Sequence, residues 1–285
     1  MIIGIGQAFN GHHKEYSKAL NKFGAQTFYF DIDTPNWVEK IKDKKADAYL
    51  WHADAKDENY RIIHDRIYFL EHVLKKKIFP DMNMYFSYND KAKQLEYFKY
   101  FKIPTIKTWM FNKYDPANNF IDKTEYPLVI KNVNSYGGKG VYLIKNKTQA
   151  KKIIEQIFKS KNGYHKIKDY LYAQEYINGL EKDLRIITIG NKVKFAYWRI
   201  NNQDWKHNVG RGGQIDSNNI PQSAIKLCEK ISKQQKFHWM AYDVFMLKNK
   251  PIILEFACNF STKGIEKHGF DVRKELMRYL HNKLK

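Results

Sequence analysis

Residues 242–256 read YDVFMLKNKPIILEF, and this stretch decides the fold of the chain. Two apolar runs flank a central Lys-Asn-Lys, which indicates a β-hairpin with a three-residue loop. Such a loop pairs Leu247 with Pro251. The same register places Asp243 opposite Glu255, with the two Cβ atoms about 5 Å apart.

These two carboxylates define a candidate metal site. Like charges directly opposite each other are destabilising unless a cation lies between them. Hard oxygen ligands suit Mg²⁺ that carries nucleotide phosphates. A protonated carboxyl, or a salt bridge from a lysine, is the alternative, and a register slip of one residue would separate the pair. The spacing favours the metal.

A second signal lies upstream, where residues 128–141 read LVIKNVNSYGGKGV. A buried strand ends in Lys131, and a loop with three glycines and a serine leads into another strand. Glycines let backbone N–H groups approach a phosphate closely, and a lysine supplies a point charge. The pattern lacks the Gly-Lys-Ser/Thr and the helix of a Walker A loop. A plain hairpin loop is the alternative to phosphate binding.

A third signal is a group of arginines in the region from about residue 170 onward. Asp183-Leu184-Arg185 opens a strand, and Arg199, Asn208 and Arg211 follow. Arginine is suited to carboxylate or phosphate recognition. Surface ion pairing is the alternative, and it fits Arg185 and Arg199 better than Arg211, which precedes two glycines.

The remaining sequence indicates an α/β (α+β) protein. Residues 1–80 alternate short apolar strands with amphipathic helices, a rhythm typical of a small parallel sheet. Strands are expected at 2–5, 26–30, 48–51, 128–131 and 141–144. Helices are expected at 13–23, 61–75, 90–101, 149–158 and near 223–234. The region from about 170 onward is expected to consist mainly of hairpins.

Composition narrows the functional classes. The net charge is +20, but only seven of the 50 basic residues are arginine and the lysines are spread along the chain, so nucleic-acid binding is not expected. An anionic substrate would use the same field. No apolar run approaches the roughly 20 residues of a membrane span. Two cysteines make no disulfide framework, which favours a cytoplasmic protein.

Taken together, the motifs from about residue 88 to 266 resemble the ATP-grasp superfamily, and within it the RimK-like carboxylate–amine ligases. Asn89-Asp90-Lys91, Gln94 and Ile103-Pro104 resemble the entry to its nucleotide domain. The resemblance implies three lobes: an N-terminal β-α-β lobe (1–87), a central nucleotide-covering lobe (88–168) and a C-terminal lobe with the metal ligands (169–285). The last two lobes would sandwich ATP.

The resemblance also implies a set of ATP-binding residues. Two lysines would hold the phosphates, a glycine-rich loop would cover them, a hinge would read adenine through its backbone, and further residues would face the nucleotide. In this sequence these are Lys91, Lys131, Ser135, Gly137, Gly138, Gly140, Glu175, Tyr176, Ile177, Asp183 and Lys206.

The implied catalytic residues are Arg211, Arg199 and Asn208, with Arg211 stabilising the oxyanion. The implied ligands of Mg²⁺ (or Mn²⁺) include Asp243 and Glu255. One departure concerns the family's asparagine two residues after the glutamate, because Ala257 stands there. Asn259 lies on the same strand face and is a candidate replacement, so the number of metals stays open.

The implied reaction is ATP-dependent amide formation between a carboxylate and an amine through an acyl-phosphate. The substrates would be small molecules or peptides, one of them acidic. Alternatives are a thiol acceptor, addition of an amino acid to a cell-surface sugar acid, or a nucleotide-binding protein with weakened catalysis. The sequence leaves the oligomeric state open, a homo-oligomer included.

Overall fold

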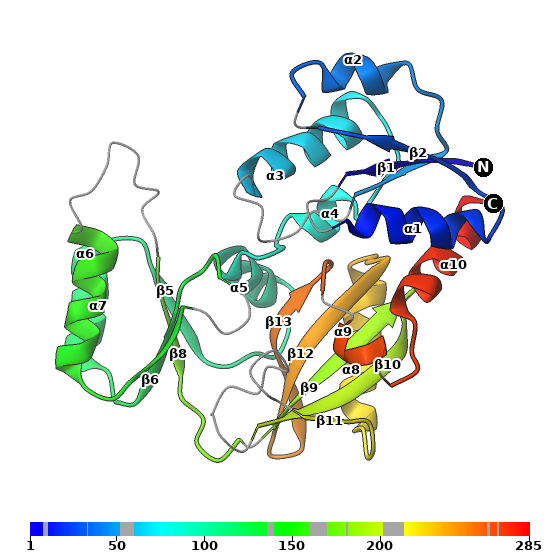
Figure 1. Cartoon of the computed structure of the whole chain (residues 1–285). Helices are drawn as coiled ribbons and strands as arrows, with labels where there is room; N and C mark the ends of the chain where they lie inside the picture. Colours follow the sequence, from blue (N-terminus) through cyan, green and yellow to red (C-terminus); the bar gives the residue numbers. More distant parts are fainter. Residues whose placement is uncertain are drawn as a thin grey trace.

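The computed structural model describes residues 1–7, 11–32, 34–51, 60–135, 140–159, 170–180, 182–201, 214–260, 263–266 and 268–285. Within them the chain forms three sheets, each covered by helices (Figure 1). The N-terminal and C-terminal sheets lie on one side of the molecule, and the central sheet stands apart from them. Helix α5 (Lys91–Tyr100) lies between the central sheet and the other two. The site discussed below is built where the central and C-terminal sheets meet.

The N-terminal sheet is parallel, as the β-α-β rhythm predicts, with strand order β2-β1-β3-β4. Its strands are β1 (Ile2–Gly6), β2 (Gln26–Phe30), β3 (Ala48–Leu50) and β4 (Ile78–Phe79). Its helices are α1 (His12–Asn21), α2 (Trp37–Lys42), α3 (Tyr60–Tyr68) and α4 (Met82–Tyr85). The helix expected at 61–75 is α3 continued by a π-helical turn, η1 (Phe69–Val73).

The central sheet is antiparallel, with order β5-β8-β6-β7. Its strands are β5 (Thr108–Phe111), β6 (Leu128–Lys131), β7 (Val141–Ile144) and β8 (Leu171–Glu175). Helices α6 (Tyr114–Lys123) and α7 (Lys147–Lys159) cover its outer face (Figure 1). Strand β8 belongs to this sheet, so a division by sheets falls after Glu175 instead of at 168.

The C-terminal sheet is antiparallel and five-stranded, with order β11-β10-β9-β12-β13. Its strands are β9 (Lys182–Ile189), β10 (Lys192–Ile200), β11 (Gln214–Asp216), β12 (Trp239–Leu247) and β13 (Lys250–Ala257). Three helices follow or interrupt them: α8 (Gln222–Gln234), α9 (Lys263–Glu266) and α10 (Val272–Leu284). Helix α10 returns to pack against α1, which brings the two chain ends close together (Figure 1).

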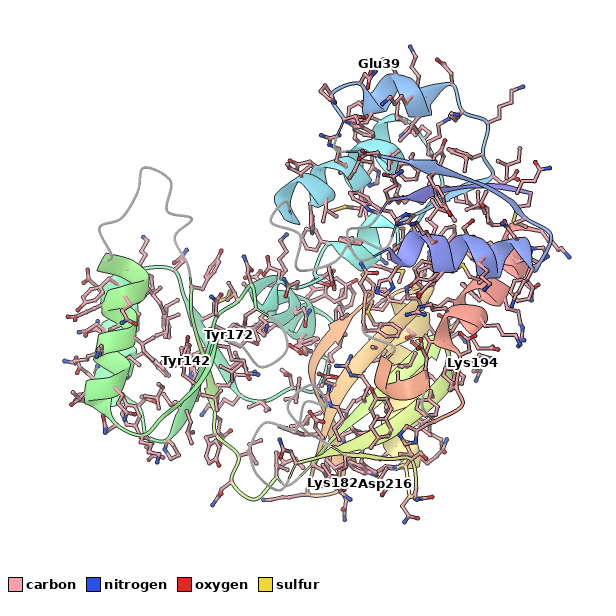
Figure 2. The ribbon with its side chains drawn as sticks, in the orientation of Figure 1. Glu39, Tyr142, Tyr172, Lys182, Lys194 and Asp216 are labelled. Carbon is pink, nitrogen blue, oxygen red and sulfur yellow. The ribbon has the colours of Figure 1, made fainter. Side chains whose placement is uncertain are left out.

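The apolar core is divided unequally among the sheets. One cluster of buried side chains is continuous from the N-terminal sheet to the C-terminal sheet, whereas the central sheet and its helices have a core of their own. A small third cluster joins helix α5 (Lys91–Tyr100) to the central sheet through Ala92, Leu95, Val133 and Tyr172. Tyr172 lies on the side of the central sheet nearer to α5, as Figure 2 shows. Helix α5 therefore connects the central and C-terminal sheets, which form the two halves of the site described below.

The deciding hairpin forms with a different turn from the one predicted. Leu247 pairs with Lys250, so the loop has two residues, Lys248 and Asn249, both with positive φ, as in a type I′ turn. The prediction of a three-residue loop is therefore wrong. A β-bulge between Asp243 and Val244 leaves Leu254 as the extra residue and restores the pairing of Asp243 with Glu255.

In the part of the chain that the structure describes, every helix is too short or too polar to cross a bilayer.

Candidate functional site

The pair of opposed carboxylates is confirmed in register, but their surroundings differ. A single row across the C-terminal sheet aligns Tyr197, Arg185, Asp243 and Glu255 on neighbouring strands. The Asp243 side chain is 5% exposed and the Glu255 side chain 39% exposed. The buried Asp243 carboxylate therefore needs a compensating charge within the protein, whereas the Glu255 carboxylate can be solvated by water.

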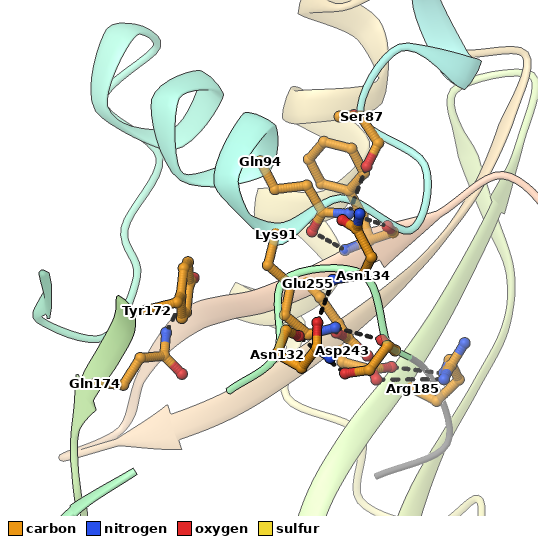
Figure 3. A network of polar contacts seen from close by, with 12 residues as sticks. Ser87, Lys91, Gln94, Asn132, Asn134, Tyr172, Gln174, Arg185, Asp243 and Glu255 are labelled. Carbon is orange, nitrogen blue, oxygen red and sulfur yellow. Dashed lines mark hydrogen bonds and ion pairs between the residues drawn. The ribbon is translucent and has the colours of Figure 1, made fainter. Parts of the chain in front are cut away.

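Two arginines supply the charge that Asp243 needs. Arg185 Nε lies 2.6 Å from Asp243 Oδ1, and Arg199 Nη2 lies 2.9 Å from Asp243 Oδ2 (Figure 3 shows Arg185). Burial acts to raise the pKa of Asp243, but the charges of Arg185 and Arg199 outweigh it and hold the pKa below its ordinary value. Asp243 is thus an ionised carboxylate held by two guanidinium groups.

Arg199 also holds a second carboxylate. Its Nε and Nη2 donate to the two oxygens of Asp183 at 2.6 and 2.5 Å, which is a bidentate pair. Burial lowers the pKa of Arg199, but Asp243 and Asp183 raise it well above its ordinary value. With a side chain 4% exposed and donors on both carboxylates, Arg199 is an internal counter-ion.

The two predicted phosphate lysines lie beside Glu255. Lys91 is buried in the first turn of α5, and its Nζ lies 3.7 Å from Glu255 Oε2 and donates to the Ser135 carbonyl at 2.5 Å. Lys131 ends β6. Burial lowers the pKa of Lys131 to about 8, with Glu255 and Asp243 raising it and Lys91 lowering it. Lys91, Lys131, Glu255 and Asp243 therefore interact electrostatically and form one charged site.

The described ends of the glycine-rich loop are tied together. The Asn132 N–H donates to the Gly140 carbonyl at 2.7 Å, and Ser135 Oγ donates to the Asn132 carbonyl at 2.9 Å. Gly140 has φ +64, and a Cβ there would lie 2.8 Å from Asn132 Cβ. The position therefore requires glycine. Gly137 and Gly138 lie outside the described residues.

The predicted adenine hinge follows β8. Glu175 is exposed at the end of the strand, and its N–H donates to the Lys107 carbonyl at 3.0 Å. Tyr176 and Ile177 continue the chain as partly buried residues. Next to the hinge, the buried Gln174 donates to Thr108 Oγ1 at 2.9 Å. The hinge thus leads directly from the central sheet toward the C-terminal sheet.

In addition to Gly137 and Gly138, three predicted site residues lie outside the described residues: Lys206, Asn208 and Arg211. Asn259 is described: it follows β13 and its amide nitrogen donates to the Tyr85 hydroxyl at 2.8 Å, so it contacts the N-terminal lobe. Ala257 is the last residue of β13. The part of the chain that is described contains no group of three His, Cys, Asp or Glu side chains arranged for a metal.

The donor set fits one Mg²⁺ that is shared with phosphate oxygens. Mg²⁺ in proteins is commonly bound through one or two carboxylates and completed by substrate phosphates and water. Asp243 and Glu255 are adjacent, and both provide hard oxygens. Arg185 contacts both oxygens of Asp243, so a metal bound there would share these oxygens with Arg185 or displace its side chain.

The sequence places Gln94 in the segment that resembles the entry to the nucleotide domain, but it predicts no contact for this side chain. Its amide bridges α5 and β13 with two hydrogen bonds to Phe256 and donates a third to the Ser87 carbonyl (Figure 3). The available signal was its spacing, since a residue three positions after Lys91 on a helix lies on the same face. Sequence could not reveal the strand on the other side of that contact.

Solved structures define the class of fold. The chain superposes on D-alanine–D-alanine ligase from Bacillus anthracis complexed with ATP with a TM-score of 0.73 and 16% identity, over 100% of this chain and 97% of that one. A RimK domain ATP-grasp protein from Sphaerobacter thermophilus gives a TM-score of 0.69 and 14% identity, over 98% and 99%. The fold is therefore the ATP-grasp fold.

The particular family follows from the sequence. A model of the RimK-like ATP-grasp domain matches residues 88–280, and the chain belongs to this family. It is 26% identical over 195 residues to the coenzyme gamma-F420-2:alpha-L-glutamate ligase of Methanocaldococcus jannaschii, covering 67% of this chain and 65% of that protein. It is 27% identical over 154 residues to the alpha-aminoadipate–LysW ligase LysX of Saccharolobus solfataricus, covering 54% of each. The chain thus spans about two thirds and about half of the lengths of these two relatives, respectively.

Proposed function

We propose that this chain is an ATP-dependent ligase that joins a carboxylate to an amine through an acyl-phosphate. The observation that carries the proposal is the meeting of Lys91 and Lys131 with Glu255 and Asp243 between two sheets. Cations from the central side and carboxylates from the C-terminal side would hold a phosphate–metal complex between them. The family and the names of the relatives support the same reaction.

ATP would lie between the central and C-terminal sheets. Lys91 and Lys131 would bind its phosphates, the loop from Ser135 to Gly140 with Gly137 and Gly138 would cover them, and the Glu175–Ile177 hinge would contact adenine through its backbone. Lys206 and Asp183 would complete the nucleotide site. A closed loop would exclude water, which protects an acyl-phosphate from hydrolysis.

Mg²⁺, or Mn²⁺ in its place, would be held by Asp243 and Glu255, with Asn259 as a further candidate ligand. The ion would neutralise charge on the phosphates as it accumulates. Arg185, displaced from Asp243, would remain close enough to meet a phosphate oxygen. Arg199 would stay with Asp183 and Asp243 and fix the direction of both carboxylates, which is a positioning role in place of the catalytic role expected from sequence.

The chemistry requires no covalent nucleophile of the protein. A substrate carboxylate oxygen attacks the γ-phosphorus, the bond to the β-γ bridging oxygen breaks, and ADP leaves. The amine then attacks the acyl carbon and loses a proton, and phosphate leaves with the carboxylate oxygen. Arg211 would stabilise the oxyanion of this second step, with Asn208 beside it.

The substrates would be small molecules or peptides, one of them acidic. The relatives named above are a glutamate ligase and an aminoadipate ligase, and the net charge of +20 suits an anionic partner. Transfer of an amino acid to a sugar acid would use the same ATP site. A homo-oligomer in the cytoplasm is compatible with this function.

A nucleotide-binding protein with weakened catalysis is the second candidate. It is favoured by Ala257 at the position of a family asparagine and by the two arginines that already hold Asp243. Such a protein would bind ATP without releasing ADP in any acceptor mixture.

The proposal is tested by incubation with ATP, Mg²⁺ and mixtures of acidic carboxylates and amines, followed by mass spectrometry. The expected product has the summed mass of two substrates minus water, formed together with ADP and phosphate. Asp243→Asn is expected to abolish it. Product formation by Asp243→Asn at the wild-type rate would refute the metal assignment.

A further inference from the structure

The outer edge of strand β13 is covered in an unusual way. β13 is the last strand of the C-terminal sheet, so the N–H and C=O groups on its outer side have no further strand to pair with. Beside Ile253 the edge is covered by the segment after α5: Ile253 N–H donates to the Pro104 carbonyl at 2.8 Å, and Thr105 Oγ1 donates to the Ile253 carbonyl at 2.7 Å.

Beyond the bulge, one side chain takes over this pairing. Gln94 Nε2 donates to the Phe256 carbonyl at 2.9 Å, and the Phe256 N–H donates to Gln94 Oε1 at 3.2 Å. The amide thus pairs with Phe256 as a peptide group of a neighbouring strand would. Its second N–H donates to the Ser87 carbonyl at 2.9 Å, and the side chain is 4% exposed (Figure 3).

Gln94 is adjacent to both partners of the Lys91–Glu255 ion pair. It lies three residues after Lys91 on the same face of α5, and it binds the residue directly after Glu255. The bulge at Leu254 makes the direction of Glu255 sensitive to how this edge is held, because a bulge replaces a ladder pairing with an unpaired residue. A displacement of α5 relative to β13 would change the distance from Lys91 Nζ to Glu255.

We propose that Gln94 is a positioning residue that sets the geometry between Lys91 and Glu255, and thereby the metal–phosphate site. This inference rests on the proposed function. The hydrogen bonds of the Gln94 amide go to main-chain groups of Ser87 and Phe256. Gln94 acts through the main chain of Phe256 and through helix α5.

The test compares Gln94→Met, which keeps the length of the side chain and removes all three hydrogen bonds, with Thr188→Val. Thr188 is fully buried in β9, its Oγ1 lies 2.8 Å from Ser232 Oγ, and it is on the opposite face of the strand from Arg185. Thr188→Val therefore loses the buried hydrogen bonds to Ser232 of α8 and to the Met240 carbonyl of β12 without touching the site. Gln94→Asn, with the amide one methylene shorter, serves as the second variant.

The readout is the Mn²⁺ affinity of the ADP complex, followed through the EPR signal of free Mn²⁺, with melting temperature as the measure of stability. We expect Gln94→Met to weaken Mn²⁺ binding by about tenfold, the low end of what outer partners of metal ligands contribute. Gln94→Asn should shift in the same direction. Thr188→Val should lower the melting temperature and leave Mn²⁺ affinity within about twofold of wild type. Excess Mg²⁺ should restore part of the turnover of Gln94→Met.

Wild-type Mn²⁺ affinity in both Gln94 variants would overturn the inference, and so would an equal loss in Thr188→Val. If Gln94→Met does not fold, Gln94→Asn decides. The proposed function fails separately, if wild-type protein binds Mn²⁺ and ADP but ligates nothing. Absence of Mn²⁺–ADP binding in the wild type would overturn both.

Discussion

The two halves of the site are both charged, but they balance their charge differently. In the C-terminal sheet, Asp183 and Asp243 face Arg185 and Arg199, two carboxylates against two guanidinium groups, at 2.5–3.2 Å. On the central side, Lys91 forms an ion pair with Glu255, and the charge of the same carboxylate raises the pKa of Lys131. The first group is neutral within itself and stabilises the sheet, whereas the second keeps an excess of positive charge for an anionic ligand.

The largest expected effect separates the two arginines. Arg199→Gln should lower the free energy of unfolding by about 3–5 kcal/mol, because it removes the bidentate guanidinium partner of Asp183 and one of the two guanidinium partners of Asp243 from a buried site. Arg185→Gln should cost less than half as much, since Asp243 keeps Arg199 and the Arg185 side chain is 18% exposed. Urea denaturation of both variants measures the difference. Equal losses would contradict the distinction between a fixed and a displaceable arginine.

The lysine half should show the opposite behaviour. Lys131→Met is expected to lower kcat/KM for ATP by about 100-fold or more, as for removal of one preorganised charge contact. Stability at neutral pH should not fall, because burial already disfavours the charged lysine. Steady-state kinetics and thermal unfolding of the same variant test both statements. A destabilised Lys131→Met with unchanged kinetics would reverse the comparison.

The pKa of Lys131 gives a pH dependence to the lysine half alone. With a pKa of about 8, Lys131 is charged below that pH and loses its proton above it. Phosphates favour the charged form, so ATP binding at higher pH must take up a proton. Between pH 7 and 9 the affinity for ATP should fall about tenfold. Lys131→Arg, which stays protonated, should flatten the profile. Calorimetry in buffers of different ionisation enthalpy detects the proton, and a wild-type profile as flat as that of Lys131→Arg would exclude this origin.

The smallest effect concerns the loop between the lysine-bearing strand and β7. Gly140→Ala should destabilise the protein by about 1–2 kcal/mol through its positive φ, plus the contact with Asn132 Cβ. Gly179→Ala is the matched control, with φ +76 and nothing within 4 Å of the new Cβ. The difference between the two variants measures the contact alone. Equal values would mean that the loop accommodates the added methyl group.

The sequence predicted the pairing of Asp243 with Glu255 although the predicted turn was wrong. Two deviations cancel there, because a turn shorter by one residue is followed by a bulge of one residue. Neither deviation could be predicted from the sequence. Lys248 and Asn249 include no glycine to mark a two-residue turn, and a leucine such as Leu254 is an ordinary residue in a strand. The pairing of Asp243 with Glu255 was predictable because it depends on the positions of the carboxylates and the apolar runs in the two strands, and the shorter turn and the bulge leave these positions opposite each other.

Helix α10 shows what patterning could have found and did not. Val272, Leu276, Met277 and Leu280 are buried at helical spacing, and Asp271 accepts from the Lys274 N–H as an N-cap. The roles of Arg185 and Arg199 were not readable in this way. Which carboxylate each arginine meets depends on register across three strands, and sequence gives no register between β9, β10 and β12.

The central claim is that a substrate carboxylate is activated by phosphorylation. It is tested most directly by supplying the carboxylate substrate found by mass spectrometry with ¹⁸O in its carboxyl group and measuring the phosphate released. The account predicts that each ligation transfers one ¹⁸O atom to phosphate, with ADP as the other product. Phosphate that carries oxygen from water, or release of AMP and pyrophosphate, would contradict it.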